Sequence, residues 1–266
     1  MSEHTYTSIR VERESDTLGH IVLDRPEEMN TFSPAMAEEL TDALSELEDD
    51  DSTRAIVITG EGRAFSAGAD VGDGMDDGGD DPTRSGVESS RHGQSVFGQF
   101  RESPLPVIAA VDGFALGAGM ELTMCADLRV ASESAEFGLP EHNLGLLPGW
   151  GGSARLQQLV GESTAKYIIF TADRFSAEQM QEWQYVHEVY PDDEFDERAI
   201  DFAQSIAEGP PIAQRYTKRA IHAAAESIDA GLEVEASSLG HLLDTDDLAE
   251  GMAAFSEQRE PEFEGK

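Results

Sequence analysis

The sequence predicts a layered α/β fold that ends in a helical region, and three patterns carry this prediction. Short β-branched runs recur at residues 6–11, 20–23, 55–59 and 107–111. A run with helical periodicity separates the second strand from the third, so two strands and a helix form a unit that can recur along the chain. From about Phe202 the strand pattern disappears and only helical patterns remain.

The helix after the second strand has a clear start signal. Ser33 is the expected N-cap, because its hydroxyl oxygen can accept a hydrogen bond from a free N–H group of the first turn. Pro34 fits the first helical position, where no N–H donor is needed. The apolar residues that share one face of this helix are Met36, Leu40, Ala43, Leu44 and Leu47.

The chain is long enough for one large domain with a small appendage. We divide it where the strands end, into a strand-rich body over residues 1–201 that carries the active site and a helical region over residues 202–266. The second region has more apolar positions than one chain can cover, so we expect it to mediate assembly between copies.

The charge is strongly acidic, because 54 Asp and Glu residues oppose 18 Lys and Arg residues and give a net charge of −36. Such a surface repels nucleic acid and anionic membranes, whose binding needs clustered cations. Self-repulsion on this scale opposes folding unless salt screens it, and the Debye length falls to about 3 Å at 1 M salt. The charge therefore predicts a halophilic protein with no nucleic-acid partner.

Targeting and cysteine patterns narrow the setting further. The first residues, MSEHTYTSIRVERESD, lack the basic and apolar regions of a signal peptide, which favours a cytoplasmic location. The longest apolar stretch, residues 104–131, is interrupted by three acids and does not fit a membrane span. The single cysteine, Cys125, excludes an intrachain disulfide and CxxC motifs. We expect neither a metal site nor a membrane partner.

Residues 72–90 are rich in Gly and Asp and contain almost no apolar side chain. The crowded aspartates suggest a calcium loop, but the EF-hand spacing of acids, glycine and closing glutamate is absent. We expect a solvated, mobile loop over these residues.

The run VIAAVDGFALGAGMELTMCADLRVAS predicts a strand, a glycine-rich turn, a helix and a further strand. Residues 117–119 lie where the helix should begin, so free N–H groups there can bind a developing anion. Glu121 is the only charged residue between Asp112 and Asp127. Two interpretations stay open: an acid that reaches solvent near a helix N-terminus, or a buried carboxyl group that handles a proton.

Two more segments offer candidate chemistry. Glu141 precedes a stretch whose glycines, between residues 145 and 152, indicate tight turns or close approach to a ligand. His142 beside it has no partner set of Ser, Cys or metal ligands. The segment GEGRAFSAGAD offers backbone donors around Ala67 and Gly68, although an ordinary strand-to-helix turn has the same composition.

Several enzyme classes lose support because their motifs are missing. The sequence contains no G-x-S-x-G nucleophile elbow, no Walker motif and no Rossmann fingerprint. Serine hydrolases, nucleotide hydrolases and NAD enzymes are therefore disfavoured. The candidate chemistry rests on the two glutamates and on backbone N–H groups.

Five segments, in order, resemble the crotonase (enoyl-CoA hydratase/isomerase) superfamily, and the resemblance covers nearly the whole chain. They are LDRPEEMNTFSPAM, AFSAGAD, PVIAAVDGFALGAGMELTMCADLRVAS, FGLPEHNLGLLPGWGGSARL and DDLAEGMAAFSEQREPEF. The resemblance implies a crotonase-like spiral of ββα units with a C-terminal helical trimerisation region, and trimers that often pair into hexamers.

The resemblance also implies an active site. It makes Ala67 and Ala118 the residues whose backbone N–H groups hold the thioester oxygen, with Ala118 at a position where the family commonly has Gly. It makes Glu121 the residue that orients and deprotonates the attacking water, and Glu141 the residue that delivers the proton to carbon. Gly149 is expected to help to hold Glu121 or the water.

For coenzyme A, the resemblance implies two groups of contacts. The turn around Arg25, Asn30 and Phe32 and the backbone near Ala64 and Asp70 are expected to bind pantetheine and adenine. The other group is C-terminal and often comes from a neighbouring subunit.

In the C-terminal group, Phe255 matches the aromatic residue that the family places against adenine. The lysine that the family places on the phosphate falls on Gln258, so Arg259 is expected to substitute for it. A second departure is EWQYVHEVYP, where the family usually reads closer to EWGLVNEVVP. Gln184 and Tyr185 therefore indicate a locally altered turn.

The pair of acids favours an enoyl-CoA hydratase, a lyase of fatty-acid metabolism that adds water across the C2=C3 bond of a trans-2-enoyl-CoA to give a 3-hydroxyacyl-CoA. The expected partners are an acyl-CoA substrate and copies of the chain in a homotrimer or hexamer, and no cofactor is expected, since coenzyme A is part of the substrate. The alternatives are an isomerase or another thioester-enolate enzyme of the same fold, and a non-catalytic binding protein, which the charge disfavours.

Overall fold

The computed structural model describes residues 6–70 and 81–266, and their strands form two sheets. The strands are β1 (Ile9–Arg13), β2 (Leu18–Leu23), β3 (Ala55–Gly60), β4 (Val107–Val111), β5 (Phe114–Leu116), β6 (Leu128–Ser132), β7 (Glu136–Gly138), β8 (Arg174–Ser176) and β9 (Glu188–Tyr190). The larger sheet has the order β1-β2-β3-β4-β6-β9, and the smaller has the order β5-β7-β8. In the larger sheet only β1 and β2 pair antiparallel.

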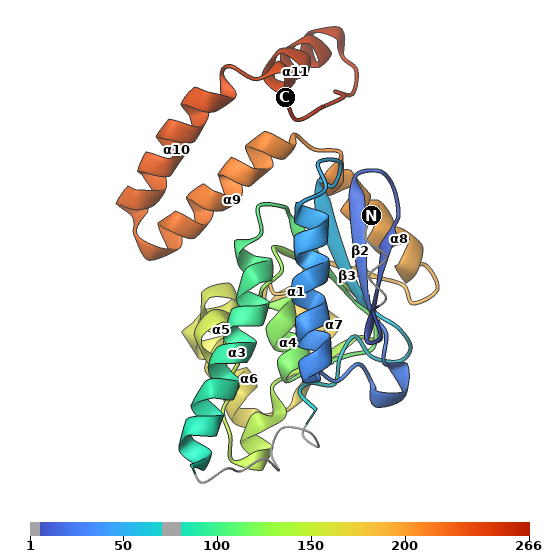
Figure 1. Cartoon of the computed structure of the whole chain (residues 1–266), viewed down its shortest axis with the longest axis vertical. Coiled ribbons are helices and arrows are strands. Elements are labelled where there is room, and N and C mark those ends of the chain that lie inside the picture. Colours follow the sequence, from blue (N-terminus) through green and yellow to red (C-terminus); the bar gives the residue numbers. More distant parts are fainter. Residues whose placement is uncertain (1–5, 71–80) are drawn as a thin grey trace.

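Helices cover the larger sheet on both faces and then leave it (Figure 1). They are α1 (Pro34–Glu48), α3 (Pro82–Glu102), α4 (Ala118–Thr123), α5 (Gly152–Val160), α6 (Glu162–Thr171), α7 (Ala177–Glu182), α8 (Phe195–Ala207), α9 (Pro211–Glu226), α10 (Ile228–Leu242) and α11 (Asp246–Glu257). Two short 3-10 helices, η1 (Pro26–Glu28) and η2 (Pro140–Leu144), lie in the loops that follow β2 and β7. The predicted α/β class is therefore confirmed.

Strand residues alternate between two cores because successive side chains point to opposite faces of a sheet. On β3, Ile56 and Ile58 join the core that contains α1 and α3, whereas Val57 joins the core beneath α8, where it meets Phe195. A central parallel strand buried on both faces needs an unbroken apolar run, which AIVIT provides.

Helix α1 begins as the sequence predicts. The side chain of Ser33 accepts a hydrogen bond from the N–H group of Met36, Pro34 occupies the first turn, and the predicted apolar face is buried. The first strand is shifted relative to the prediction, since β1 covers Ile9–Arg13. The loop expected over residues 72–90 is wrong from Pro82 onward, because α3 begins there; residues 71–80 lie outside the described part of the chain.

The helical region separates from the sheets later than expected. The boundary drawn between residues 201 and 202 lies inside α8, which packs on the larger sheet. Helices α9, α10 and α11 then extend away from the rest of the chain (Figure 1). Lys218 of α9 reaches back to the core, where its ammonium donates to Asp127 Oδ2 at 2.7 Å and to the carbonyl oxygen of Leu105 at 3.0 Å.

Across the described residues, none of the helices combines the length and the apolar character that a membrane crossing requires.

Candidate active site

The site is built around the start of α4. After β5, Gly117 adopts φ 53°, and a Cβ atom built on it would lie 3.0 Å from Glu141 Oε1. At Gly119 a Cβ atom would lie 2.3 Å from the carbonyl oxygen of Ser66. The glycines are therefore needed for close packing of α4 against the segment that follows β3 and against η2. Every residue of α4 is buried, including Glu121.

Glu121 is a buried carboxyl group, with 2% of its surface exposed. Its Oε1 atom accepts hydrogen bonds from the backbone N–H groups of Trp150 and Gly152, both at 2.8 Å. Burial raises the pKa of Glu121 from 4.5 to about 7, the N–H of Gly152 opposes that rise, and the charge of Glu141 adds to it. Of the two interpretations left open by the sequence, the structure rules out the acid that reaches solvent; the proton-handling role of the buried carboxyl group stays a prediction.

Gly149 does not donate a hydrogen bond to Glu121, so of its two expected roles only that of holding the water stays a prediction. The N–H donors on Glu121 belong to Trp150 and Gly152, whereas the carbonyl oxygen of Gly149 accepts hydrogen bonds from Ser90 Oγ at 2.6 Å and Gln94 Nε2 at 2.9 Å. The glycine turn does hold Glu121, but through different residues.

Glu141 lies at the first turn of η2 and faces α4. Its Oε2 atom is buried and has no hydrogen-bond partner among the described residues. Burial raises the pKa of Glu141. A carboxyl oxygen that is buried without a partner is costly for the free protein, so this atom points to a contact that a bound molecule supplies.

The expected pair of backbone donors needs one correction. The N–H of Ala67 donates to the carbonyl oxygen of Met29 at 2.9 Å, so it cannot hold a substrate oxygen. The N–H of Phe32 donates to the carbonyl oxygen of Gly68, and the N–H of Asp70 donates to the carbonyl oxygen of Phe32. The N–H of Ala69, the residue that follows Gly68, has no acceptor in the described part of the chain.

Ala69 and Ala118 therefore form the corrected pair. A Cβ atom built on Gly68 would lie 3.6 Å from the nitrogen of Ala118, which places the neighbouring Ala69 close to the start of α4. Ala118 is the first residue of α4, where an N–H group has no acceptor within the helix. Two free N–H groups close together can bind the oxygen of a polarised carbonyl group.

Two of the residues expected to bind coenzyme A, Asn30 and Phe32, are buried in the turn beside the site. Asn30 is fully buried, and its Nδ2 atom donates to the carbonyl oxygen of Ala64 at 2.7 Å. The ring of Phe32 is also buried and packs 6.2 Å from that of Trp150. Arg25 and Asp70 are partly exposed and form an ion pair of 3.6 Å, so their charges are the ones that a ligand at this rim can reach.

Phe255 and Arg259 belong to α11 and the turn after it, within the extension that leaves the core (Figure 1). The side chain of Phe255 is 87% exposed. Arg259 is already bound to Glu250 and Glu257, with contacts of 2.8 Å to each. Gln258 ends α11 in a left-handed conformation, φ 56°. None of these residues is brought to Glu121 within one chain.

The altered turn at residues 184–185 contacts α4 through the side chain of Tyr185. Gln184 adopts φ 62°, a conformation that favours glycine. Tyr185 is fully buried, and its hydroxyl lies 2.6 Å from Thr123 Oγ1 and 3.3 Å from the carbonyl oxygen of Met120. The tyrosine thus contacts the helix that carries Glu121.

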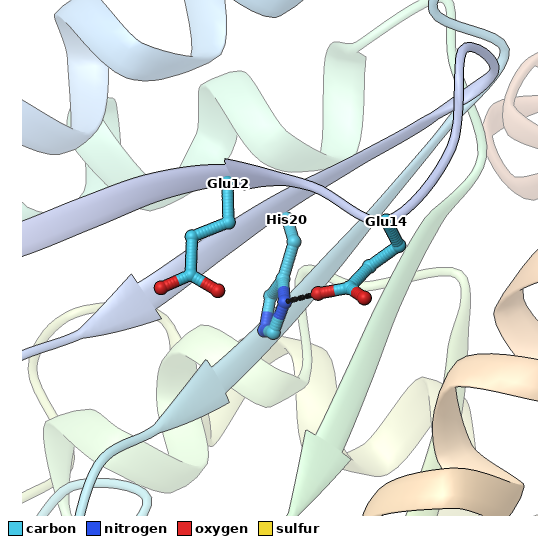
Figure 2. Close-up of side chains that lie close together, drawn as sticks. All are labelled: Glu12, Glu14 and His20. Atoms are coloured by element: carbon cyan, nitrogen blue, oxygen red, sulfur yellow. Dashed lines mark hydrogen bonds and ion pairs between the residues drawn. The ribbon is translucent and has the colours of Figure 1, made fainter.

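A separate cluster lies on the β1–β2 hairpin, where Glu12, Glu14 and His20 place possible metal-ligand atoms within 4.8 Å of one another (Figure 2). Nδ1 of His20 is hydrogen bonded to Glu14 and Nε2 to Thr59, both at 2.7 Å. Glu12 pairs with Arg10 at 2.9 Å. We interpret the cluster as a hydrogen-bonded network, because each of these groups already has a protein partner.

Sequence reasoning missed Ala69, Trp150 and Gly152. The glycine turn was a visible signal for the last two, since an acid in an apolar helix needs N–H donors from a neighbouring loop. Trp150 is fixed by the rings of Phe97, at 5.3 Å, and Phe32.

Comparisons with known proteins extend over nearly the whole chain. The family model of enoyl-CoA hydratase/isomerase matches residues 13–266. A probable enoyl-CoA hydratase of Mycobacterium bovis is 37% identical over 260 residues, which cover 97% of this chain and 98% of the relative. A crotonyl-CoA hydratase of Syntrophomonas wolfei is 36% identical over 266 residues, covering 98% and 99%.

Solved structures give the same result. The crystal structure of an enoyl-CoA hydratase from Bacillus anthracis matches with a TM-score of 0.91 and 34% identity, covering 98% of this chain and 100% of that chain. One from Geobacillus kaustophilus matches with a TM-score of 0.90 and 38% identity, covering 98% and 99%. The α/β spiral expected from the sequence is the fold of these structures.

Proposed function

This chain belongs to the enoyl-CoA hydratase/isomerase family, and on that premise we propose that it hydrates trans-2-enoyl-CoA thioesters to 3-hydroxyacyl-CoA. The observation that carries the proposal is the pair of carboxyl groups with raised pKa values, Glu121 and Glu141, beside two free backbone N–H groups. Hydration takes one proton from water and adds one proton to carbon, which requires a base and an acid in one site.

The N–H groups of Ala69 and Ala118 are the proposed donors to the thioester oxygen. They polarise the conjugated double bond toward that oxygen and stabilise the enolate charge that develops there when water adds at C3. One preorganised donor of this kind typically contributes about 10²- to 10³-fold in rate.

Glu121 is the proposed base. Its Oε1 atom already accepts two hydrogen bonds, so Oε2 is the atom left to receive the proton of the water that attacks C3. Glu141 is the proposed acid that gives its proton to C2. Its buried Oε2, which lacks a protein partner, is the atom suited to that contact. One proton is accepted and one is donated, so the step balances.

The two roles require opposite protonation states. Burial raises the pKa of both groups, and the Glu141 charge raises that of Glu121 further. Two carboxylates in an apolar site resist joint ionisation, so we propose that the pair shares one proton near neutral pH. The overall addition of water involves no net redox change, so the mechanism calls for no cofactor beyond the coenzyme A of the substrate.

For coenzyme A itself, Arg25 and Asp70 are the proposed contacts within the chain, because they are the partly exposed members of the expected set. Asn30, Phe32 and Ala64 are proposed to act by shaping the turn. Phe255 and Arg259, which form the C-terminal group, are proposed to contact coenzyme A in the site of a neighbouring copy.

We further propose a homotrimer or hexamer that forms through α9, α10 and α11, in a salt-rich cytoplasm. An apolar cavity of about 440 Å³ lies among these helices. Large apolar side chains exposed along them are Ile221, Ile228, Leu232, Leu239, Leu243, Leu248, Met252 and Phe255. Exposed apolar surface of this kind is typical of protein interfaces.

The test of the function is a screen of trans-2-enoyl-CoA chain lengths in molar KCl, followed by loss of the conjugated-thioester absorbance. We expect turnover with at least one chain length. Conversion of a 3-enoyl-CoA to the conjugated isomer, without hydration of any trans-2-enoyl-CoA, would instead establish an isomerase. Light scattering in the same buffer tests the assembly, and a monomer of 28.8 kDa would contradict it.

A further inference from the structure

Arg155 is a cation in an unusual position. It lies in the first turn of α5, where the helix dipole disfavours positive charge. In a chain with three times as many acidic as basic residues, its guanidinium forms no ion pair within the described residues. Its hydrogen bond goes to the carbonyl oxygen of Trp150 at 2.9 Å. Something other than a surface acid must account for its placement.

The guanidinium packs against the turn that holds Glu121. Gly151 adopts φ 121°, a conformation that favours glycine, and a Cβ atom built on it would lie 1.9 Å from Arg155 Nη1, so the guanidinium lies directly against this residue. Arg155 binds the carbonyl oxygen of Trp150, and the N–H of the same residue donates to Glu121 Oε1. Arg155 is therefore hydrogen bonded to Trp150, the residue that supplies one of the two hydrogen bonds to the carboxylate of Glu121.

The charges that act on Glu121 come from few elements. The charge of Glu141 acts on it from η2 and that of Arg155 from α5. The thiol of Cys125, four residues after Glu121, is another titratable group that interacts with it. β5, which also packs on α4, carries no charged residue. Arg101 of α3 bears on Cys125. Arg155 thus opposes Glu141: its charge lowers the pKa of Glu121, whereas that of Glu141 raises it.

We propose that Arg155 is a positioning residue for hydration, which holds the 149–152 turn against Glu121 and favours the ionised carboxylate. The inference rests on the proposed function, because it assigns Glu121 the role of base. It has two separable parts: the hydrogen bond that holds the turn, and the positive charge.

Three variants separate these parts. Arg155→Lys keeps the charge and a donor, Arg155→Gln keeps a donor only, and Arg155→Met keeps neither. Removing the charge raises the pKa of Glu121, so we expect the acid limb of the pH profile of kcat/KM to move to higher pH in Arg155→Gln and Arg155→Met. We expect Arg155→Lys to keep the wild-type midpoint.

The role of the hydrogen bond is tested by kcat at the optimum of each variant's pH profile. We expect Arg155→Met to lower this maximal kcat at least about tenfold, with Arg155→Gln closer to wild type. An unchanged midpoint of the acid limb in Arg155→Gln would refute the role of the charge, and an unchanged maximal kcat in Arg155→Met would refute the role of the hydrogen bond. Arg198→Gln is the matched control, because Arg198 lies on α8, contacts Glu194 and Tyr190, and should move neither quantity.

A measurement that does not depend on turnover tests the inference separately from the proposed function. The carboxyl infrared band of Glu121 is obtained by difference from Glu121→Gln and titrated between pH 5 and pH 9, where the surface acids are ionised. An upward shift of its midpoint in Arg155→Gln supports the role of the charge even if no enoyl-CoA is hydrated, whereas an unshifted midpoint refutes that role. A wild-type protein without hydratase activity overturns only the proposed function.

Discussion

Replacing Glu121 with glutamine should strongly lower kcat and, at the same time, remove a pH-dependent cost to folding. The amide oxygen can keep the hydrogen bonds from Trp150 and Gly152, so the shape of the site is conserved. The proton acceptor is lost, and general bases typically contribute about 10²- to 10⁴-fold. We therefore expect kcat to fall at least about 100-fold, with KM for the enoyl-CoA nearly unchanged.

The stability effect follows from the pKa of Glu121, which is about 7 in the folded chain against an ordinary value of 4.5. The folded state binds this proton more tightly than the unfolded state, so wild-type stability falls as pH rises from 4.5 through 7. Between pH 5 and pH 8 the loss amounts to about 2 to 3 kcal/mol. Glutamine does not titrate, so the variant should be spared that part of the loss.

Urea unfolding in molar KCl at pH 5 and pH 8 measures this difference, because any constant cost of the buried amide cancels between the two pH values. Glu133→Gln serves as the matched control, since Glu133 is exposed and should show neither effect. If the variant retained more than half of the wild-type turnover, Glu121 would not be the base. If both proteins lost the same stability between pH 5 and pH 8, the argument from burial would be wrong.

Four further outcomes are expected. Glu141→Gln should lower kcat at least about 100-fold at unchanged KM, because C2 loses its proton donor; steady-state kinetics near wild type would contradict this. The pH profile of kcat/KM should rise with pH through about 7 as Glu121 ionises, and a profile flat from pH 5 to pH 8 would exclude it as the base. Tyr185→Phe removes the hydroxyl contact with Thr123 and should lower the free energy of unfolding by about 1 kcal/mol, measured by urea unfolding. Tyr190→Phe is the control, and its loss of stability should be smaller because Tyr190 lacks that hydroxyl contact. Dilution from molar KCl to 0.01 M should dissociate or unfold the protein as the Debye length grows to about 30 Å; circular dichroism and turnover unchanged at 0.01 M would show that the acidic surface is not a salt adaptation.

The sequence predicted elements whose signals are local. Ser33 and Pro34 mark the start of α1 without help from the rest of the chain. The start of α3 was mistaken for a loop because its first residues are polar or small. Its apolar anchors, Val96, Phe97 and Phe100, come more than two turns later.

Site details that depend on long-range contacts could not be predicted. Ala67 and Ala69 flank the same glycine, and nothing nearby in the chain shows that the carbonyl oxygen of Met29 occupies the N–H of Ala67. Likewise, GWGG suggests donors for Glu121 but not which residues supply them. The acids were easier to find, because a lone charge in an apolar helix stands out in the sequence whichever way the backbone runs.

The contact between Lys218 and Asp127 has a practical consequence for chemical labelling. The chain contains only three lysines, and the ammonium of Lys218 is buried against the core. Lys166 and Lys266 have side chains that are 57% and 68% exposed, one on α6 and the other at the end of the chain beside α11. An amine-reactive dye will therefore attach to these two lysines and to the α-amino group of the chain. Once that group is blocked, a donor and an acceptor fluorophore can be confined to the core and to the helical extension without any substitution in the sequence.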